Sequence, residues 1–301
     1  GLDPWLTEGR ILGKLGQTER ALAAYDEVLR RDAKSSAALA GRAEIFRASG
    51  EMETAAAEIA RAVALNPKDR EAHRIEMAIF KARGDTAGAL AALDAVITAG
   101  PDDAGAWIER GILLKERGQL DAAIASYTEA LKHDGKSASA LLNRGLARHA
   151  AKDYDRAIAD FSDALALKPD SADAVLARGA ALEFKGNAEA AIDEYTRAAG
   201  MAPEWAAPLR NRGFLLIKRK DMATGCRDLA AADKLEPKHA TTIWYIGRCQ
   251  AAEGNRDAAM KSFTEAAGLD PALRPFLIKE TSGASAAAAP VTKSAAAKPA
   301  P

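Results

Sequence analysis

Four arginines recur at a fixed spacing of 34 residues: Arg110, Arg144, Arg178 and Arg212. Evenly spaced guanidinium groups could bind successive phosphates of a charged polymer, because arginine forms paired hydrogen bonds with phosphate oxygens. Acidic residues stand at one matching place in three of the same segments: Asp160, Glu194 and Asp228. We therefore expect most of these arginines to form ion pairs between helices, with phosphate binding as the alternative.

Histidine and cysteine give little indication of catalysis. The four histidines never pair at metal-ligand spacing on one helix: His73, His133, His149 and His239. The sequence contains no phosphate-binding glycine loop, serine nucleophile elbow or zinc-protease motif. Cys226 and Cys249 are either two buried thiols or one bridge between neighbouring helices, and a bridge would suit an oxidising compartment. We expect no catalytic residue, no metal and no cofactor.

The composition limits the kind of partner. The 42 basic and 42 acidic residues cancel, which argues against a partner held mainly by charge, such as a nucleic acid or an anionic membrane surface. No run of apolar residues approaches the roughly 20 that a membrane-spanning helix needs. We therefore expect a protein or peptide partner. The chain begins with Gly1 rather than Met, so removal of a targeting segment or a preceding domain is one explanation of its start.

The whole sequence from residue 2 to residue 273 repeats with the same period, in eight blocks of 34 residues. The eighth place of each block is small in all blocks but the third: Gly9, Ala43, Met77, Gly111, Gly145, Gly179, Gly213 and Gly247. The twentieth place is alanine or glycine throughout, and the twenty-fourth is large and apolar. Two columns of small residues predict two helices that cross closely, with the glycines at their contact points.

Glycine and proline mark the ends of the expected helices. Glycine stands at place fifteen in most blocks and separates the two helices of a unit, while proline at place thirty-two ends the second helix. A pair of helices of this length cannot bury both of its faces. Neighbouring pairs must therefore stack into a solenoid.

These columns resemble the tetratricopeptide repeat, and the resemblance covers residues 2 to 273. It implies an all-α fold, a right-handed α-solenoid of eight 34-residue helix-turn-helix repeats, of the bacterial type. A cytoplasmic and a periplasmic location both remain open. The sequence departs from the pattern at His73 and Met77 in the third block, and at Lys152 and Lys220, where the helix break usually has glycine.

The end of the chain differs from the repeats. Residues 274–280 contain Pro275 and are expected to form a short C-terminal cap segment. Residues 281–301 consist almost entirely of Ala, Pro, Ser, Thr and Lys, without an aromatic or acidic side chain, and are expected to form a disordered tail.

The resemblance also implies a concave groove, lined by the first helix of each repeat at places two, five, six, nine and twelve to thirteen. The early blocks contribute charged residues there: Arg10, Lys14, Glu44, Arg47, Glu71, Arg74 and Lys81. The later blocks contribute aromatic, aliphatic, amide and basic residues: Leu142, Asn143, Leu146, His149, Leu176, Phe184, Arg210, Asn211, Phe214, Ile217, Trp244, Tyr245 and Arg248. We expect this second set to bind a peptide, with apolar pockets for affinity and amide donors for the backbone. The alternative is that Phe184, Phe214 and Trp244 only fill the inside of the superhelix.

We expect a non-catalytic adaptor that holds a peptide or helical segment of a partner protein. One alternative is a substrate-docking module of a larger enzyme. Another is a self-assembling scaffold, because the short cap leaves an end of the solenoid open to stacking. The carboxylate clamp that some relatives use is not matched, since Asn143 lacks its companions and Arg210–Asn211 is only a partial likeness.

Overall fold

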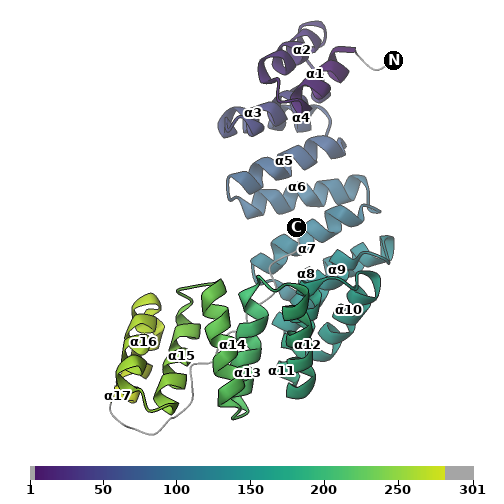
Figure 1. The fold of residues 1–301 in the computed structure, drawn as a ribbon. Helices are drawn as coiled ribbons and strands as arrows, with labels where there is room; N and C mark the ends of the chain where they lie inside the picture. Colours follow the sequence, from purple (N-terminus) through teal and green to yellow (C-terminus); the bar gives the residue numbers. More distant parts are fainter. Residues whose placement is uncertain (1–3, 282–301) are drawn as a thin grey trace. The chain divides into compact units, whose positions relative to one another are not determined.

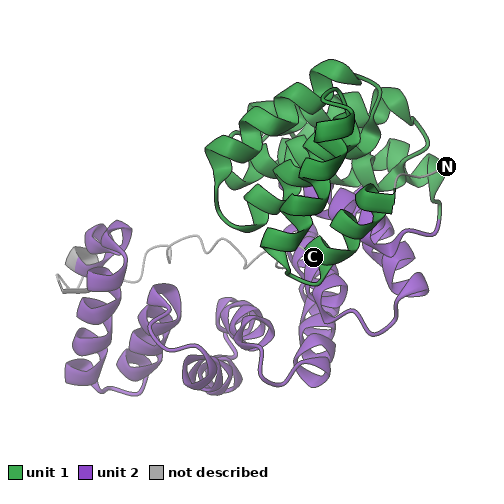
Figure 2. Ribbon diagram, turned by 90° about the horizontal axis from the view of Figure 1, so that it is seen from above, with its two compact units in different colours: residues 1–135 green, residues 136–301 purple. Residues whose placement is uncertain are grey.

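The computed structural model describes residues 4–281, and all regular secondary structure within them is helical (Figure 1). The chain divides into two compact units, residues 1–135 (unit 1) and 136–301 (unit 2), coloured separately in Figure 2. The helices of unit 1 are α1 (Pro4–Lys14), α2 (Thr18–Arg31), α3 (Ser36–Ala48), α4 (Met52–Leu65), α5 (Arg70–Ala82), α6 (Thr86–Ala99), α7 (Ala104–Glu116) and α8 (Leu120–His133). Those of unit 2 are α9 (Ala138–Ala150), α10 (Tyr154–Leu167), α11 (Ala172–Lys185), α12 (Ala188–Met201), α13 (Ala206–Lys218), α14 (Met222–Leu235), α15 (Ala240–Ala252), α16 (Arg256–Leu269), a 3-10 turn η1 (Pro271–Leu273) and α17 (Arg274–Thr281).

From α1 to α16, each odd-numbered helix packs against the helix that follows it, and the pairs stack in chain order within each unit (Figure 1). An odd-numbered helix is therefore the first helix of a repeat, and an even-numbered helix is the second. This arrangement confirms the predicted all-α solenoid of helix-turn-helix repeats.

The glycines at place eight lie where the two helices of a repeat meet. A Cβ atom added to Gly145 would lie 2.6 Å from the ring of Phe161, and one added to Gly111 would lie 2.5 Å from the ring of Tyr127. Both rings belong to place twenty-four and are fully buried. The glycines are contact points, as predicted, but the nearest neighbours of Gly111 and Gly145 are these large rings, and a residue at place twenty is among the nearest only at glycines such as Gly213 and Gly247.

Local signals set the helix ends. The side chains of Asp103, Ser137 and Ser171 each accept a hydrogen bond from a backbone N–H in the first turn of the following helix. In unit 1 every turn inside a repeat has a glycine with positive φ, between 70° and 83°. In unit 2, Lys152 (φ 64°) and Lys220 (φ 71°) adopt the same left-handed conformation, which disfavours residues with a Cβ atom.

The last repeat of unit 2 is covered by the segment that follows it. Leu273 of η1 is buried, and Phe276 and Leu277 of α17 pack on the apolar cluster formed by α15 and α16. The predicted cap segment, residues 274–280, thus lies in a helix that packs on the last repeat. The tail predicted beyond it lies outside the described residues from 282 onward.

Unit 2 also contains a disulfide between Cys226 of α14 and Cys249 of α15. Of the two alternatives left open by the sequence, the structure has the bridge. It joins the second helix of one repeat to the first helix of the next.

Candidate functional site

The residues expected to line a groove in unit 2 separate into a buried set and an accessible set. The buried residues are Leu142, Asn143, Leu176, Arg210, Asn211, Ile217, Trp244 and Tyr245. The accessible ones are Leu146, His149, Phe184, Phe214 and Arg248. Only the second set, together with the edges of its neighbours, offers a surface to another molecule in this structure.

Trp244 is a core residue and not a surface residue, contrary to the expectation for a groove. Its side chain is 1% exposed, its ring centroid lies 4.7 Å from that of Phe263 on α16, and Phe276 of α17 lies 6.2 Å away. Leu142, Leu176 and Arg210 hold the same repeat place and are buried as well, so burial at this place recurs along unit 2. At Trp244 the segment after the last repeat adds Phe276 to the packing, so Trp244 stabilises the end of the array.

The expected amide and basic donors are also largely occupied or covered. Asn143 Nδ2 donates to the Ser139 carbonyl, one turn back in α9, at 3.0 Å. Arg210 pairs with Glu236 through Nη2 at 3.1 Å. Asn211 is buried in α13. These side chains strengthen the array, and they are poorly placed to donate to the backbone of a peptide.

An aromatic cluster of His149 (α9), Tyr154 (α10) and Phe184 (α11) forms the first accessible feature. The rings of Tyr154 and Phe184 stack at 5.7 Å, and His149 meets each of them edge-on, at 5.4 and 5.3 Å. Phe184 is 44% exposed, which is high for a large apolar side chain. Burial lowers the pKa of His149, although a hydrogen bond with the backbone of Ala180 acts in the opposite direction.

A second accessible feature, the Tyr245 patch, consists of Phe214 (α13), Tyr245 and Arg248 (α15). The rings of Phe214 and Tyr245 lie 4.6 Å apart, and the Arg248 guanidinium lies over the Tyr245 ring at 5.4 Å. Burial raises the pKa of the Tyr245 hydroxyl, while Arg248 acts in the opposite direction. Arg248 and Phe214 keep part of their surface exposed.

Two residues of this surface were missed by the sequence reasoning. Glu183 of α11 accepts a hydrogen bond from the Tyr195 hydroxyl at 2.7 Å, and burial raises the pKa of its carboxyl group. It holds the same repeat place as His149, so the register alone could have identified it. Tyr154 begins a second helix, outside the places expected to face the groove, and no sequence signal marked it.

Unit 1 contains a pocket of about 950 Å³. Most of its lining comes from α1, α3 and α5, which are the first helices of the first three repeats. It includes most of the charged residues expected on the inner face of the early repeats: Arg10, Lys14, Glu44, Arg47, Glu71 and Arg74. Several of these charges already pair within unit 1. Arg47 lies 2.7 Å from Glu44, and Arg74 pairs with Asp103.

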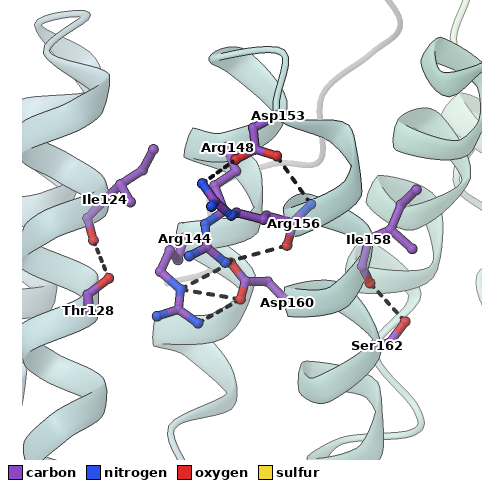
Figure 3. Close-up of polar contacts among 9 residues, drawn as sticks. All are labelled: Ile124, Thr128, Arg144, Arg148, Asp153, Arg156, Ile158, Asp160 and Ser162. Atoms are coloured by element: carbon purple, nitrogen blue, oxygen red, sulfur yellow. Dashed lines mark hydrogen bonds and ion pairs between the residues drawn. The ribbon is translucent and has the colours of Figure 1, made fainter.

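Three of the four evenly spaced arginines form ion pairs between the two helices of their own repeat, as predicted for most of them, whereas Arg110 pairs with Asp94 of the preceding repeat at 2.7 Å. In Figure 3, Arg144 and Arg148 of α9 both reach Asp160 of α10, each at 2.7 Å. Arg178 pairs with Glu194 at 2.6 Å, and Arg212 with Asp228 at 2.7 Å. These guanidinium groups are engaged within the fold, so nothing in this geometry favours the phosphate-binding alternative.

Neither a metal site nor a membrane span was found in the described part of the chain. No three His, Cys, Asp or Glu side chains gather there as a metal ion would require. Among the same residues, no helix combines the length and apolarity needed to cross a bilayer.

Comparison with known sequences and structures was made for the whole chain. The sequence model of the tetratricopeptide repeat matches residues 6–70, 79–120, 108–172 and 150–204. No curated protein sequence gave a match.

Solved structures resemble the fold. A tetratricopeptide repeat protein from Parabacteroides merdae is 18% identical, with 82% of this chain and 99% of that chain covered and a TM-score of 0.66. For pilF of Pseudomonas aeruginosa the identity is 18%, the coverages are 71% and 100%, and the TM-score is 0.61. For the C-terminal part of a repeat protein from Cytophaga hutchinsonii the values are 14%, 91%, 98% and 0.59. At these identities the likeness is one of fold.

Proposed function

This chain belongs to the tetratricopeptide repeat family, and we propose that it is a non-catalytic adaptor whose unit 2 holds a segment of a partner protein. Repeats of this family serve as protein-interaction scaffolds, and the family is typically non-catalytic. A shared fold does not name the partner. The proposal therefore depends on the surface of unit 2.

The observation that carries the proposal is the exposure of large rings on successive first helices. Phe184 on α11 and Phe214 on α13 keep apolar surface accessible, although each already touches another ring. Burial of such a side chain by a partner contributes roughly 1.5–3 kcal/mol, and clustered aromatic residues commonly dominate binding energy. These two rings are the expected anchor points.

The same surface favours an apolar segment over a strongly charged one. Asn143 and Arg210 are committed to contacts within the fold. Two charged groups near the rings are the half-buried carboxyl of Glu183 and the guanidinium of Arg248. We expect the partner segment to place aliphatic or aromatic side chains against Phe184 and Phe214, with few charges between them.

Peptide selection tests the proposal directly. Peptides of about twelve residues, enough to follow several repeats, would be selected from a random phage-displayed library on the immobilised full chain. Their affinities would then be measured by calorimetry. Phe184→Ala and Phe214→Ala should each weaken the selected peptide by about tenfold or more, because a ring is removed from a hot spot.

A matched control comes from unit 1. Leu15 directly follows α1 and is 66% exposed, so Leu15→Ala removes an accessible apolar side chain outside the proposed surface. It should change the affinity by less than about twofold, as expected for residues outside a hot spot. If the two phenylalanine variants bind as well as the Leu15→Ala variant, the proposed surface is not the binding site.

A second candidate, self-association, is favoured by the outer face of α1. Ile11 is 53% exposed and Leu15 lies one turn further on, whereas Ile45, at the place equivalent to Ile11, is buried against the preceding helix pair. Within the described residues no helix covers this face of α1. Light scattering over a wide concentration range should detect a dimer that Ile11→Glu disperses. A wild-type chain that stays monomeric throughout excludes this candidate.

A further inference from the structure

The contact between α14 and α15 has a different chemistry from equivalent contacts in the array. In unit 1, the aliphatic residue at place ten of a first helix lies in one apolar cluster with place twenty-one of the preceding second helix. Ile45 with Leu22 and Leu113 with Leu90 are examples. Cys249 and Cys226 hold these two places in unit 2, and their sulfurs are bonded. At this contact a disulfide bond takes the place of the packing between two aliphatic side chains.

The same contact lacks the polar bridge seen between earlier repeats of unit 2. Arg178 of α11 donates to Ser162 of α10 at 3.2 Å, and Arg212 of α13 donates to Thr196 of α12 at 2.9 Å. The equivalent residues at the next contact are Ile246 of α15 and Ala230 of α14, whose side chains form no hydrogen bond. The last repeat is therefore linked to the repeat before it by a disulfide, whereas the earlier repeats of unit 2 are linked by hydrogen bonds from Arg178 and Arg212.

The disulfide lies next to the Tyr245 patch. Cys249 directly follows Arg248 and comes one helical turn after Tyr245, and Cys226 packs in the same apolar cluster as Phe214 and Tyr245. Phe214 belongs to α13 and Tyr245 to α15, so their ring contact depends on how firmly α15 is held beside α14. Cys226 is half-buried, whereas Cys249 is buried.

We propose that the Cys226–Cys249 disulfide is a redox switch of the partner surface of unit 2, an inference that rests on the function proposed above. A dithiol reductant opens it. One thiolate of the reductant attacks Sγ of Cys226, the more accessible residue, and Cys249 leaves as a thiolate. The second thiol of the reductant then releases Cys226. The protein gains two electrons and two protons as two thiols, and the reductant leaves as a disulfide.

Reduction changes the attachment of α15 and leaves its fold in place. A thiol is a small apolar group, so both cysteines remain compatible with the packing positions that Leu22 and Ile45 occupy in unit 1. The link between the last two repeats then depends on packing alone, without a covalent bond or an arginine bridge. The α15–α17 segment opens more often, and Tyr245 and Arg248 lose their fixed positions beside Phe214.

Hydrogen exchange of the full chain, with dithiothreitol as the reductant, tests the attachment without any ligand. A thiol titration should find no free thiol before reduction and two after it. Amide exchange in α15 and α16 should become about tenfold faster or more, because the cross-link no longer restricts opening. Exchange in α9 and α10 should change by less than about twofold, since local opening is not uniform across a structure. The control is Cys226→Ala/Cys249→Ala, which should exchange rapidly and ignore dithiothreitol.

Affinity for a selected peptide tests the switch itself. Reduction should weaken binding to the wild-type chain by about tenfold or more, and the double alanine variant should not respond. Two free thiols before reduction, unchanged exchange in α15, or an unchanged affinity would each overturn the proposal. Failure of the adaptor proposal would be a separate result. It would appear as peptide binding that does not change in the Phe184→Ala and Phe214→Ala variants, and the amide exchange rates do not enter that test.

Discussion

Unit 1 and unit 2 are built from the same repeat, yet their first helices present different chemistry. In unit 1 the pocket gathers both signs of charge, and Arg47 and Glu44 already pair within it. In unit 2 the accessible side chains include Phe184 and Phe214, and the half-buried Glu183 accepts a hydrogen bond from Tyr195 of the partner helix. For the adaptor function proposed above, this difference favours the apolar surface of unit 2 as the binding surface, because buried aromatic side chains commonly dominate binding energy.

The difference shows which places of the repeat are free to vary. Arg47 and His149 hold the same place in their repeats, one in a charged pocket and the other in an aromatic cluster. At place eight, by contrast, Gly111 and Gly145 meet a buried ring in the same way in both units. The contact between helices fixes the residues at the packing places, while the residues at the inner places differ in chemistry between the two units.

The largest expected effect tests whether the packing places are equivalent in the two units. Gly111→Leu and Gly145→Leu should each destabilise the chain by about 3 kcal/mol or more, because the added side chain overlaps a fully buried ring. Urea unfolding followed by circular dichroism measures the loss. Gly200→Leu is the control, since a Cβ atom there meets nothing within 4 Å. A mild effect at either packing glycine would break the equivalence.

The next effect sharpens the comparison at place twenty-three, where the fifth repeat, in unit 2, has the carboxylate of Asp160 and the fourth repeat, in unit 1, has the hydroxyl of Ser126. Asp160 is 2% exposed and holds both Arg144 and Arg148, whereas Ser126 accepts from Arg110 at 2.8 Å. Asp160→Ala should cost about 2–3 kcal/mol because two arginines lose an ionic partner. Ser126→Ala should cost about 1 kcal/mol, the usual value for one hydrogen bond. Equal losses in urea unfolding would contradict this difference.

A smaller effect concerns the turns inside the repeats. Lys152 in unit 2 has φ 64°, while Gly118 holds the equivalent place in unit 1 with φ 72°. Lys152→Gly should stabilise the chain by about 1 kcal/mol, since glycine adopts this conformation without a Cβ clash. Gly118→Lys should destabilise it by a similar amount. Thermal unfolding of both variants measures these two changes in stability. If both variants shifted the midpoint of unfolding in the same direction, the argument would be refuted.

The fold was predictable because its signals recur. Gly111, Gly145 and their equivalents stand at one spacing, and each repeat supplies an independent copy of the same packing rule. The ion pair of Arg144 with Asp160 was predictable for the same reason, since both partners follow the period.

The site was less predictable because its details depend on contacts that do not recur. Trp244 packs on Phe276, which belongs to the segment after the last repeat. Asn143 bonds to its own helix, and Tyr154 enters the aromatic cluster from a second helix. The disulfide forms because Cys226 and Cys249 face one another across the contact between two repeats. A single pair of cysteines does not recur along the sequence, so the repeat pattern could not predict the bond.

The smallest expected effect is an acid sensitivity located in unit 2. Burial lowers the pKa of His149 below its ordinary value of 6.5, so the folded ring resists a proton that the unfolded ring accepts. Above about pH 6.5 the imidazole is neutral in both the folded and the unfolded chain. Below about pH 6.5 the unfolded chain binds a proton more readily than the folded chain, so the free energy of unfolding falls as the pH drops toward the lower folded pKa. His149→Gln should therefore lose less unfolding free energy than the wild type between about pH 7.5 and 5.5, the range in which histidine titrates.

The comparison with unit 1 isolates the cause of this acid effect. His133 is exposed at the end of α8, so His133→Gln is the control for replacing a histidine outside the aromatic cluster. Burial also raises the pKa of Glu183, and this acts in the opposite direction, because the folded carboxyl keeps its proton to higher pH than the unfolded one. The wild-type profile therefore combines opposing contributions, and only the difference from His149→Gln reports the histidine. Identical profiles for His149→Gln and His133→Gln would show that burial in the aromatic cluster does not control protonation.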